Sequence, residues 1–120
     1  MGNGDSQASA PCVVETGYQA WLWIDARVAS FPTDARRSLG HRAVEAALDA
    51  VEAVTEASYT RAGALRTRRL YDAQRALTRL RLLLRGARDR RHLSLDQHEH
   101  AMRLLDDFGR QLGGLLKAGT

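Results

Sequence analysis

Both prolines of this 120-residue chain, Pro11 and Pro32, lie in its first third. Beyond Pro32, therefore, no proline interrupts a helix. Apolar residues recur there at helical spacing, only short connectors separate the periodic stretches, and no alternating run is long enough for a useful strand. The pattern predicts an all-α chain of four amphipathic helices. Such helices, joined by short connectors, would pack as an antiparallel up-down-up-down four-helix bundle.

The periodicity places the helices at about residues 14–29, 34–60 and 65–90, with the last one opening at Ser94. Phe31-Pro32 ends the first helix, because the residue before proline is pushed out of the α region. Ser94 and Gln97 form a predicted capping box. The predicted inner faces consist, helix by helix, of Val14, Tyr18, Trp21, Ile24, Val28 and Phe31; Leu39, Ala43, Ala46, Ala47, Ala50, Val54 and Ala57; Ala73, Ala76, Leu77, Leu80, Leu83, Leu84 and Ala87; and Leu95, Ala101, Met102, Leu105, Phe108, Leu112, Leu115 and Leu116.

The expected organisation is a disordered tail over residues 1–12 and one bundle domain over residues 13–118. A chain of 120 residues fits a single domain. Met1–Pro11 has neither the basic start nor the apolar stretch of a signal peptide, and no apolar run reaches the length of about 18 residues that a membrane span needs. Cys12 is the single cysteine, so no intramolecular disulfide is expected. These features predict a cytoplasmic protein.

Positive charge is concentrated in the segment Arg61–Arg91. It holds eleven arginines and two acidic residues, a net charge of +9, whereas the whole chain carries only +4. This asymmetry predicts an anionic partner, with nucleic-acid phosphates neutralised without base specificity. The alternatives are a solvated face and the arginine enrichment of a GC-rich genome. The residues predicted to bind nucleic acid are Arg66, Arg68, Arg69, Arg75, Arg79, Arg85, Arg88, Arg90 and Arg91.

A second group of residues is expected on the outside of the bundle as an oligomer interface. Trp23 falls opposite the predicted inner face of its helix, and tryptophan is enriched in interface cores. Tyr71 and Leu82 fall opposite the leucine face of the third helix. The acidic stripe of the second helix, which we expect to face a neighbouring subunit or solvent, is Glu45, Asp49, Glu52 and Glu56.

Motifs for catalysis and for metal binding are sparse. A di-iron bundle needs Glu-x-x-His motifs, and the chain has none. A helix would place His98 on its core-facing side, as a packed and hydrogen-bonded histidine, and would point His100 outward. No metal and no cofactor are therefore expected. Arg85 and His92 have an Arg-x6-His spacing that resembles the motif of the helical nucleases called HEPN domains, in which His acts as acid or base and Arg stabilises the phosphorane.

Several short sequences recur together in the order of a known family. They are Tyr18 followed by Phe31-Pro32, Leu39-Gly40-His41-Arg42, Ala57-Ser58-Tyr59, Leu82-Leu83-Leu84-Arg85 with Asp89, Leu93-Ser94 with His98, and Gly109-Arg110-Gln111-Leu112-Gly113-Gly114. In this order and spacing the chain resembles, from about Val14 to Lys117, the accessory variability determinant proteins of diversity-generating retroelements. Their wider four-helix-bundle family includes proteins encoded in intervening sequences of bacterial 23S ribosomal RNA genes.

The resemblance implies a homopentameric barrel of four-helix subunits with a basic surface and no catalytic site. Such a protein binds the reverse transcriptase of the retroelement and associates with template RNA and cDNA, and so supports mutagenic reverse transcription. A ribosomal-RNA-associated structural bundle and an RNase that uses Arg85 and His92 are the alternatives. Unlike many basic relatives, this chain has one lysine, Lys117, and a net charge of only +4. That departure favours binding to the enzyme over stand-alone binding to nucleic acid.

Overall fold

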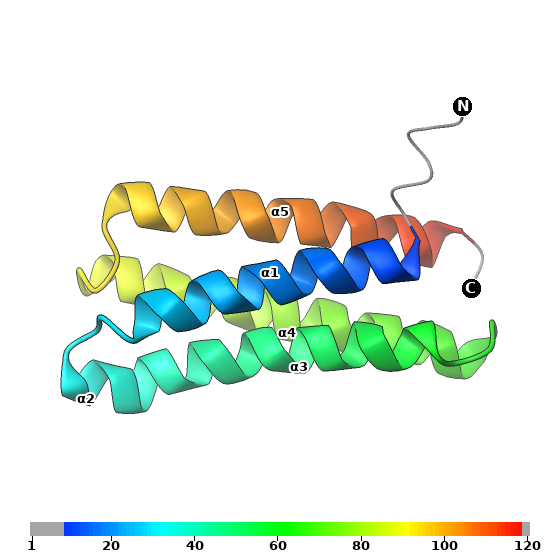
Figure 1. Cartoon of the computed structure of the whole chain (residues 1–120), viewed down its shortest axis with the longest axis horizontal. Helices are drawn as coiled ribbons and strands as arrows, with labels where there is room; N and C mark the ends of the chain where they lie inside the picture. The colour runs from blue at the N-terminus through cyan, green and yellow to red at the C-terminus, as the bar shows by residue number, and fades with distance from the viewer. Residues whose placement is uncertain (1–8, 119–120) are drawn as a thin grey trace.

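The computed structural model describes residues 9–118, and within them it contains helices and turns but no strand. Figure 1 shows long helices that lie side by side, with consecutive ones running in opposite directions. This part of the chain is therefore an all-helical bundle, as predicted. The elements are α1 (Ala10–Val28), α2 (Thr33–Ala35), the π-helical turn η2 (Arg36–Gly40), α3 (His41–Ser58), α4 (Ala64–Asp89) and α5 (Leu95–Lys117).

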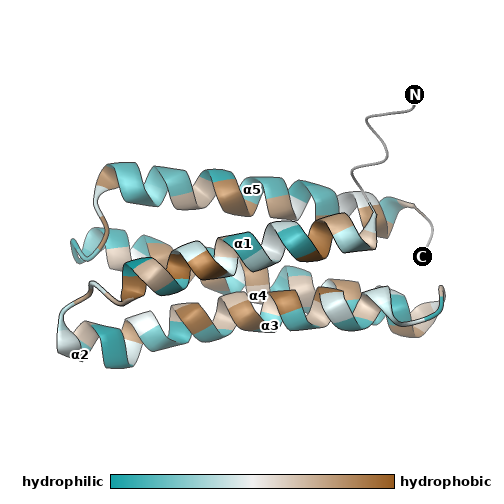
Figure 2. Cartoon of the chain, in the orientation of Figure 1, coloured by the Kyte–Doolittle hydropathy of each residue, from teal (hydrophilic) through white to brown (hydrophobic). Residues whose placement is uncertain are grey.

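The core lies between four neighbouring helix pairs. Helix α3 packs against α1 and α4, and α5 packs against the same two helices from the other side. In Figure 2 the hydrophobic residues lie mainly on the sides of the helices that face their neighbours, and the outer edge of α5 is hydrophilic. The predicted alanine face of α3 is buried from Ala43 to Ala57. Small side chains let the neighbouring helices approach α3 closely, while Ile24, Leu80 and Phe108 fill the interior.

Helix α1 begins earlier than predicted. Ser9 is its N-cap and accepts a hydrogen bond from the Cys12 amide at 3.4 Å. Pro11 lies in the first turn, where the missing amide hydrogen costs nothing. The predicted disordered tail over residues 1–12 is therefore wrong for residues 10–12, and residues 1–8 lie outside the described part of the chain.

The buried face of α1 also differs from the prediction. Val13, Gly17 and Ala20 are buried above Ile24, whereas Tyr18 is 41% exposed and Trp21 is half-buried. The reason is a close approach of two helices, since a Cβ on Gly17 would lie 2.8 Å from Cε1 of Phe108. Large apolar side chains dominate a hydrophobic pattern, but here the small residues face the core because only they leave room for Phe108.

The predicted second helix is continuous in direction but contains the π turn η2. Gly40 ends this turn and is buried against the end of α1. A Cβ at Gly40 would lie 2.6 Å from Cγ1 of Val28 and 3.2 Å from Cδ2 of Phe31. Glycine is needed at this position because the backbone of η2 touches side chains of α1 directly.

The connection between α4 and α5 is a tight turn through Arg91. The Arg91 amide donates to the Arg88 carbonyl at 2.9 Å, and the His92 amide donates to the Ala87 carbonyl at 2.8 Å. These two bonds form a Schellman motif, whose left-handed position usually holds glycine, yet Arg91 occupies it with a φ of 65°.

The predicted capping box of Ser94 and Gln97 at the start of α5 is confirmed. Leu95, predicted to face inward, is instead 75% exposed in the first turn of α5.

Candidate nucleic-acid and partner surfaces

The arginines predicted to bind nucleic acid fall into two groups in the structure. The first group has exposed side chains with no ion pair or hydrogen bond to any of residues 9–118, and it comprises Arg68, Arg75, Arg79, Arg90 and Arg91. Unpaired guanidinium groups are available to phosphate or carboxylate groups of a partner, which they can bind through two parallel hydrogen bonds. The first three lie along α4, and the last two lie at the turn that follows it.

The second group is engaged within the chain. The Arg69 Nε lies 3.4 Å from Glu56 Oε1, and the Arg88 Nη2 lies 2.9 Å from Asp89 Oδ1. Arg85 is 4.0 Å from Asp89 and is still 67% exposed at its side chain. Arg66 is half-buried, and its Nε is enclosed without a partner among the described residues. To bind an anion, the arginines of this second group would therefore have to rearrange more than the unpaired arginines of the first group.

The unpaired arginines of α4 line its solvent side, which we call the α4 outer face. Two hollows of about 520 and 630 Å³ follow one another along it, and Arg75 lines both. The first hollow also contains Arg68 and Tyr71, and the second contains Arg79 and Leu82. The α4 outer face is defined by Arg68, Tyr71, Arg75, Thr78, Arg79, Leu82 and Arg85.

Apolar side chains lie among these arginines. Tyr71 is 55% exposed and Leu82 is 66% exposed. The sequence pattern predicts both for a subunit interface separate from the basic surface. The structure instead places them on the same face of α4 as Arg75 and Arg79. The α4 outer face thus combines positive charge, which suits nucleic-acid phosphates, with apolar area, which suits a protein partner.

The acidic stripe predicted on the second helix lies on the outside of α3. Glu45, Asp49, Glu52 and Glu56 are all exposed. Glu56 already pairs with Arg69 of the same chain, whereas the other three carboxylates have no partner within residues 9–118. Negative charge on α3 thus lies beside the positive charge of α4.

Trp23 does not point away from the bundle as predicted. It is half-buried, its ring centroid lies 4.9 Å from that of His100, and the Arg27 guanidinium lies 5.7 Å from its ring centroid. The predicted outward direction of His100 is also wrong, because its ring on α5 lies against the Trp23 ring on α1. Because α1 is turned to bury Gly17 and Ala20, Trp23 comes to face α5.

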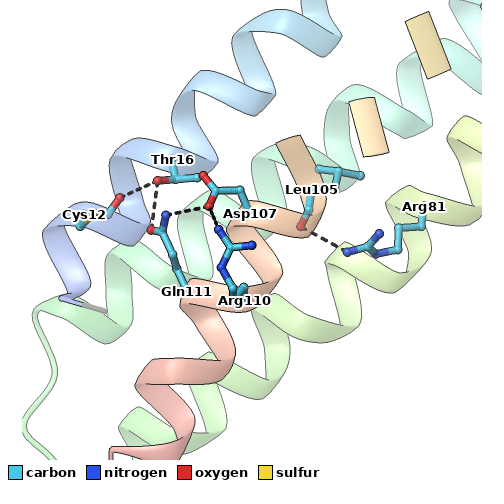
Figure 3. A network of polar contacts seen from close by, with 7 residues as sticks. All are labelled: Cys12, Thr16, Arg81, Leu105, Asp107, Arg110 and Gln111. Carbon is cyan, nitrogen blue, oxygen red and sulfur yellow. Dashed lines mark hydrogen bonds and ion pairs between the residues drawn. The ribbon is translucent and has the colours of Figure 1, made fainter. Parts of the chain in front are cut away.

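Polar contacts between helices were not visible in the sequence. Arg81 of α4 donates to Asp106 Oδ1 at 2.8 Å. It also donates to the Leu105 carbonyl at 3.2 Å (Figure 3). Arg81 therefore holds α4 against α5. A Cβ on Gly109 would lie 3.2 Å from Cδ2 of Leu77 and 3.4 Å from the Arg81 Nη2, so α4 and α5 approach closely at this glycine. The glycine at position 109 is the sequence feature that indicates a close approach of two helices here.

A second polar network joins α1 to α5 (Figure 3). The Thr16 hydroxyl lies 3.0 Å from the Cys12 carbonyl and 3.1 Å from Gln111 Oε1. The Gln111 amide donates to Asp107 Oδ1 at 3.4 Å, and Arg110 bonds to the same oxygen. Part of the glycine-rich C-terminal sequence, Gly109–Gly114, therefore holds α5 in register with its neighbours.

His98 lies on the inner side of α5, but its predicted hydrogen bond is not present at Nε2. That nitrogen is buried and has no partner among residues 9–118. Burial lowers the pKa of His98 below its ordinary value, and the charge of Arg88 lowers it further, with partial opposition from Asp89. No group of three or more His, Cys, Asp or Glu side chains in this part of the chain is arranged to hold a metal ion.

The two residues of the nuclease-like spacing occupy different surroundings. Arg85 lines a hollow on the α4 outer face and approaches Asp89. His92 is half-buried, and its ring centroid lies 5.4 Å from that of Phe31. It lines other hollows, at the end of the bundle. Within one chain the structure therefore does not assemble Arg85 and His92 into a shared site.

No helix of the described residues is both long and apolar enough to span a membrane. Comparison with curated proteins returned no match, and neither did comparison with solved structures. Comparison with protein-family models matched residues 18–119 to the family described as bAvd-like, that is, to the accessory variability determinants. The matched region contains the π turn, the α4 outer face and the glycine-rich end of α5. The chain therefore belongs to the bAvd-like family.

Proposed function

We propose that this protein is a non-enzymatic, cytoplasmic accessory protein of a diversity-generating retroelement. In this role it binds the reverse transcriptase together with template RNA or cDNA and supports mutagenic reverse transcription. Membership of the bAvd-like family supports the accessory role. The observation that carries the binding proposal is the α4 outer face, on which Arg68, Arg75 and Arg79 are exposed and unpaired.

The spacing of these arginines suits a nucleic-acid backbone. Arg75 and Arg79 are about one helical turn apart, a rise of roughly 6 Å, and Arg68 lies about two turns before Arg75. Cations at such intervals neutralise successive phosphates whatever the base sequence. Tyr71 and Leu82 add apolar contact area between them. The enzyme and its RNA would thus meet the protein on one mixed surface.

We also propose that the subunits form a homopentameric ring. The acidic residues Glu45, Asp49 and Glu52 on the outside of α3 favour a contact with a basic part of the next subunit other than its α4 outer face, which stays open to the enzyme and its RNA. Two different faces in contact make a heterologous interface, which closes into a ring when the rotation between subunits permits it. Light scattering at micromolar concentration measures the assembly. A stable monomer would contradict this part of the proposal.

Nucleic-acid binding is tested with the double variant Arg75→Glu, Arg79→Glu. RNA affinity measured over a range of salt concentrations should fall, and the slope of log K against log salt should shrink by about 1.4 if two single-strand phosphate contacts are lost. Arg37→Glu, Arg103→Glu is the matched control, since it changes the net charge equally and both arginines are exposed outside the α4 outer face. An equal loss of RNA affinity in the control would mean that net charge alone causes the effect.

Enzyme binding needs its own experiment. The tagged protein, co-expressed with a reverse transcriptase encoded beside it, should retain the enzyme after nuclease treatment. Tyr71→Ser, Leu82→Ser should weaken this retention, because it removes apolar area from the α4 outer face without changing charge. Leu95→Ser, at another exposed leucine, should leave it intact. Failure of the wild type to retain the enzyme would overturn the proposed role.

A further inference from the structure

A hollow of about 510 Å³ lies at one end of the bundle, apart from the α4 outer face. One wall comes from η2 and the start of α3, with Ser38, Leu39 and Arg42, and the other comes from the turn after α4, with Arg90 and His92. These walls are far apart in the sequence and meet only in the folded chain. The volume falls within the range of about 300–1,000 Å³ that is usual for small-ligand sites.

The two guanidinium groups in this hollow are unpaired. Arg42 and Arg90 are exposed, and neither guanidinium makes a hydrogen bond or an ion pair with residues 9–118. His92, two residues after Arg90, also lines the hollow and is half-buried against Phe31, with ring centroids 5.4 Å apart. Contact with Phe31 restricts the imidazole, so ordering its ring around a ligand costs little further entropy. Two free guanidinium groups and an imidazole suit a phosphate group.

Both walls of the hollow are built on irregular backbone. Ser38 and Leu39 belong to the π turn Arg36–Gly40, and π turns within α-helices occur frequently at functional sites. Arg90 and His92 flank Arg91, a non-glycine residue at a φ of 65°, and residues held in such conformations also cluster at ligand sites. Two separate irregular backbone segments thus form the walls of this one hollow.

One acidic group also lines the hollow. Asp34 contributes a carboxylate, and the Ser38 hydroxyl donates to the Asp34 carbonyl at 2.8 Å. The carboxylate opposes an anion but does not neutralise either guanidinium, since it forms no ion pair with them. A ligand would therefore sit toward Arg42, Arg90 and His92, and the strength of its binding would depend on the charge of Asp34.

We propose that the end hollow, centred on Arg42, Arg90 and His92, is a binding site for a single phosphate group. The phosphate belongs either to a nucleic-acid strand or to a free small phosphate compound. This inference is independent of the α4 outer face. RNA binding that depends on Arg75 and Arg79 can persist when the end hollow is empty, and the reverse also holds.

Inorganic phosphate is the first probe, added to the full-length protein labelled with ¹⁵N and followed by NMR. Saturable shifts are expected at the side chains of Arg42, Arg90 and His92. The variant Arg42→Gln, Arg90→Gln should weaken the affinity at least about tenfold, the usual effect of losing charge-assisted hydrogen bonds. Arg37→Gln is the matched control, because Arg37 is an exposed arginine of the same π turn that does not line the hollow.

Asp34→Asn gives a test of opposite sign. Removal of a negative charge from the wall should tighten phosphate binding several-fold, which a generally destabilised protein would not show. Circular dichroism confirms that each variant is folded. Shifts that do not saturate, or that spread equally over Arg75 and Arg79, would overturn the inference. So would unchanged binding in the Arg42→Gln, Arg90→Gln protein.

A second probe identifies the source of the phosphate. A 5′-phosphorylated tetranucleotide and its unphosphorylated counterpart are each added in competition with inorganic phosphate. Competition by both would support a phosphodiester of a nucleic-acid strand, and competition by the phosphorylated one alone would support a terminal phosphate. If neither competes while inorganic phosphate still binds saturably, the site is supported as one for a free phosphate compound.

Discussion

Arg81 on α4 and Asp106 on α5 form an ion pair of 2.8 Å, and the same guanidinium donates to the Leu105 carbonyl at 3.2 Å. The pair explains why one arginine of the basic segment is unavailable to a partner. The contact lies beside Gly109, where a Cβ would lie 3.2 Å from Cδ2 of Leu77, so the two helices also pack closely here. Helices α4 and α5 are thereby held by a polar contact as well as by leucine packing.

Removing this pair should lower stability modestly. The side chains of Arg81 and Asp106 are 36% and 64% exposed, so water screens their attraction. A double-mutant cycle with Arg81→Met and Asp106→Asn should give a coupling energy of about 0.5–1 kcal/mol. Urea unfolding at matched protein concentration measures it. A coupling energy of zero would mean that the two side chains are held together by packing alone.

A methyl group at Gly17 should disturb the contact between α1 and α5. Gly17→Ala places Cβ 2.8 Å from Cε1 of Phe108, a residue that is 2% exposed and has little room to move. We expect a loss of about 1–3 kcal/mol in the free energy of unfolding. Gly113→Ala is the control, since nothing lies within 4 Å of its Cβ position. It should gain up to about 1 kcal/mol from helix propensity, and equal behaviour of the two variants would contradict the close approach.

The left-handed turn at Arg91 should make glycine preferable to alanine there. Arg91→Gly and Arg91→Ala both remove the charge, but only glycine adopts a φ of 65° without strain. The glycine variant should be more stable than the alanine variant by about 1 kcal/mol in urea unfolding. Alanine equal to or better than glycine would show that the turn relaxes at little cost.

Stability should decrease in mildly acidic solution because of His98. Burial and the charge of Arg88 lower the pKa of His98 in the folded protein below 6.5, the ordinary value that the unfolded chain retains. As the pH falls through that value, the unfolded chain binds a proton that the folded protein resists, so the free energy of unfolding decreases. Above it both states are neutral and this contribution is fully present.

The measurement is urea unfolding of wild type and His98→Gln between about pH 7.5 and 5.5, a range that brackets the ordinary histidine pKa. His98→Gln should lose less stability over this range than the wild type. His41→Gln replaces an exposed histidine and should keep the wild-type dependence. The same dependence in His98→Gln as in the wild type would assign the acid sensitivity to other groups.

Local features were predictable from the sequence because they depend on neighbouring residues. The capping box of Ser94 and Gln97 is one such feature, and the alanine face of α3 is another. The face of α1 was not predictable in the same way. The pattern favours Tyr18 and Trp21 for the core, yet α1 buries Gly17, where the close approach of Phe108 leaves no room for a Cβ.

The sequence by itself determined the helices, their approximate ends and the charge of the segment from Arg61 to Arg91, since periodicity, capping and composition are properties of the chain. The tertiary structure decided which arginines remain unpaired, because Arg69 and Arg81 form ion pairs with carboxylates on other helices. It also decided that Arg42 and Arg90 share a hollow. Such contacts depend on how closely and at what rotation the helices pack, and local spacing does not encode either.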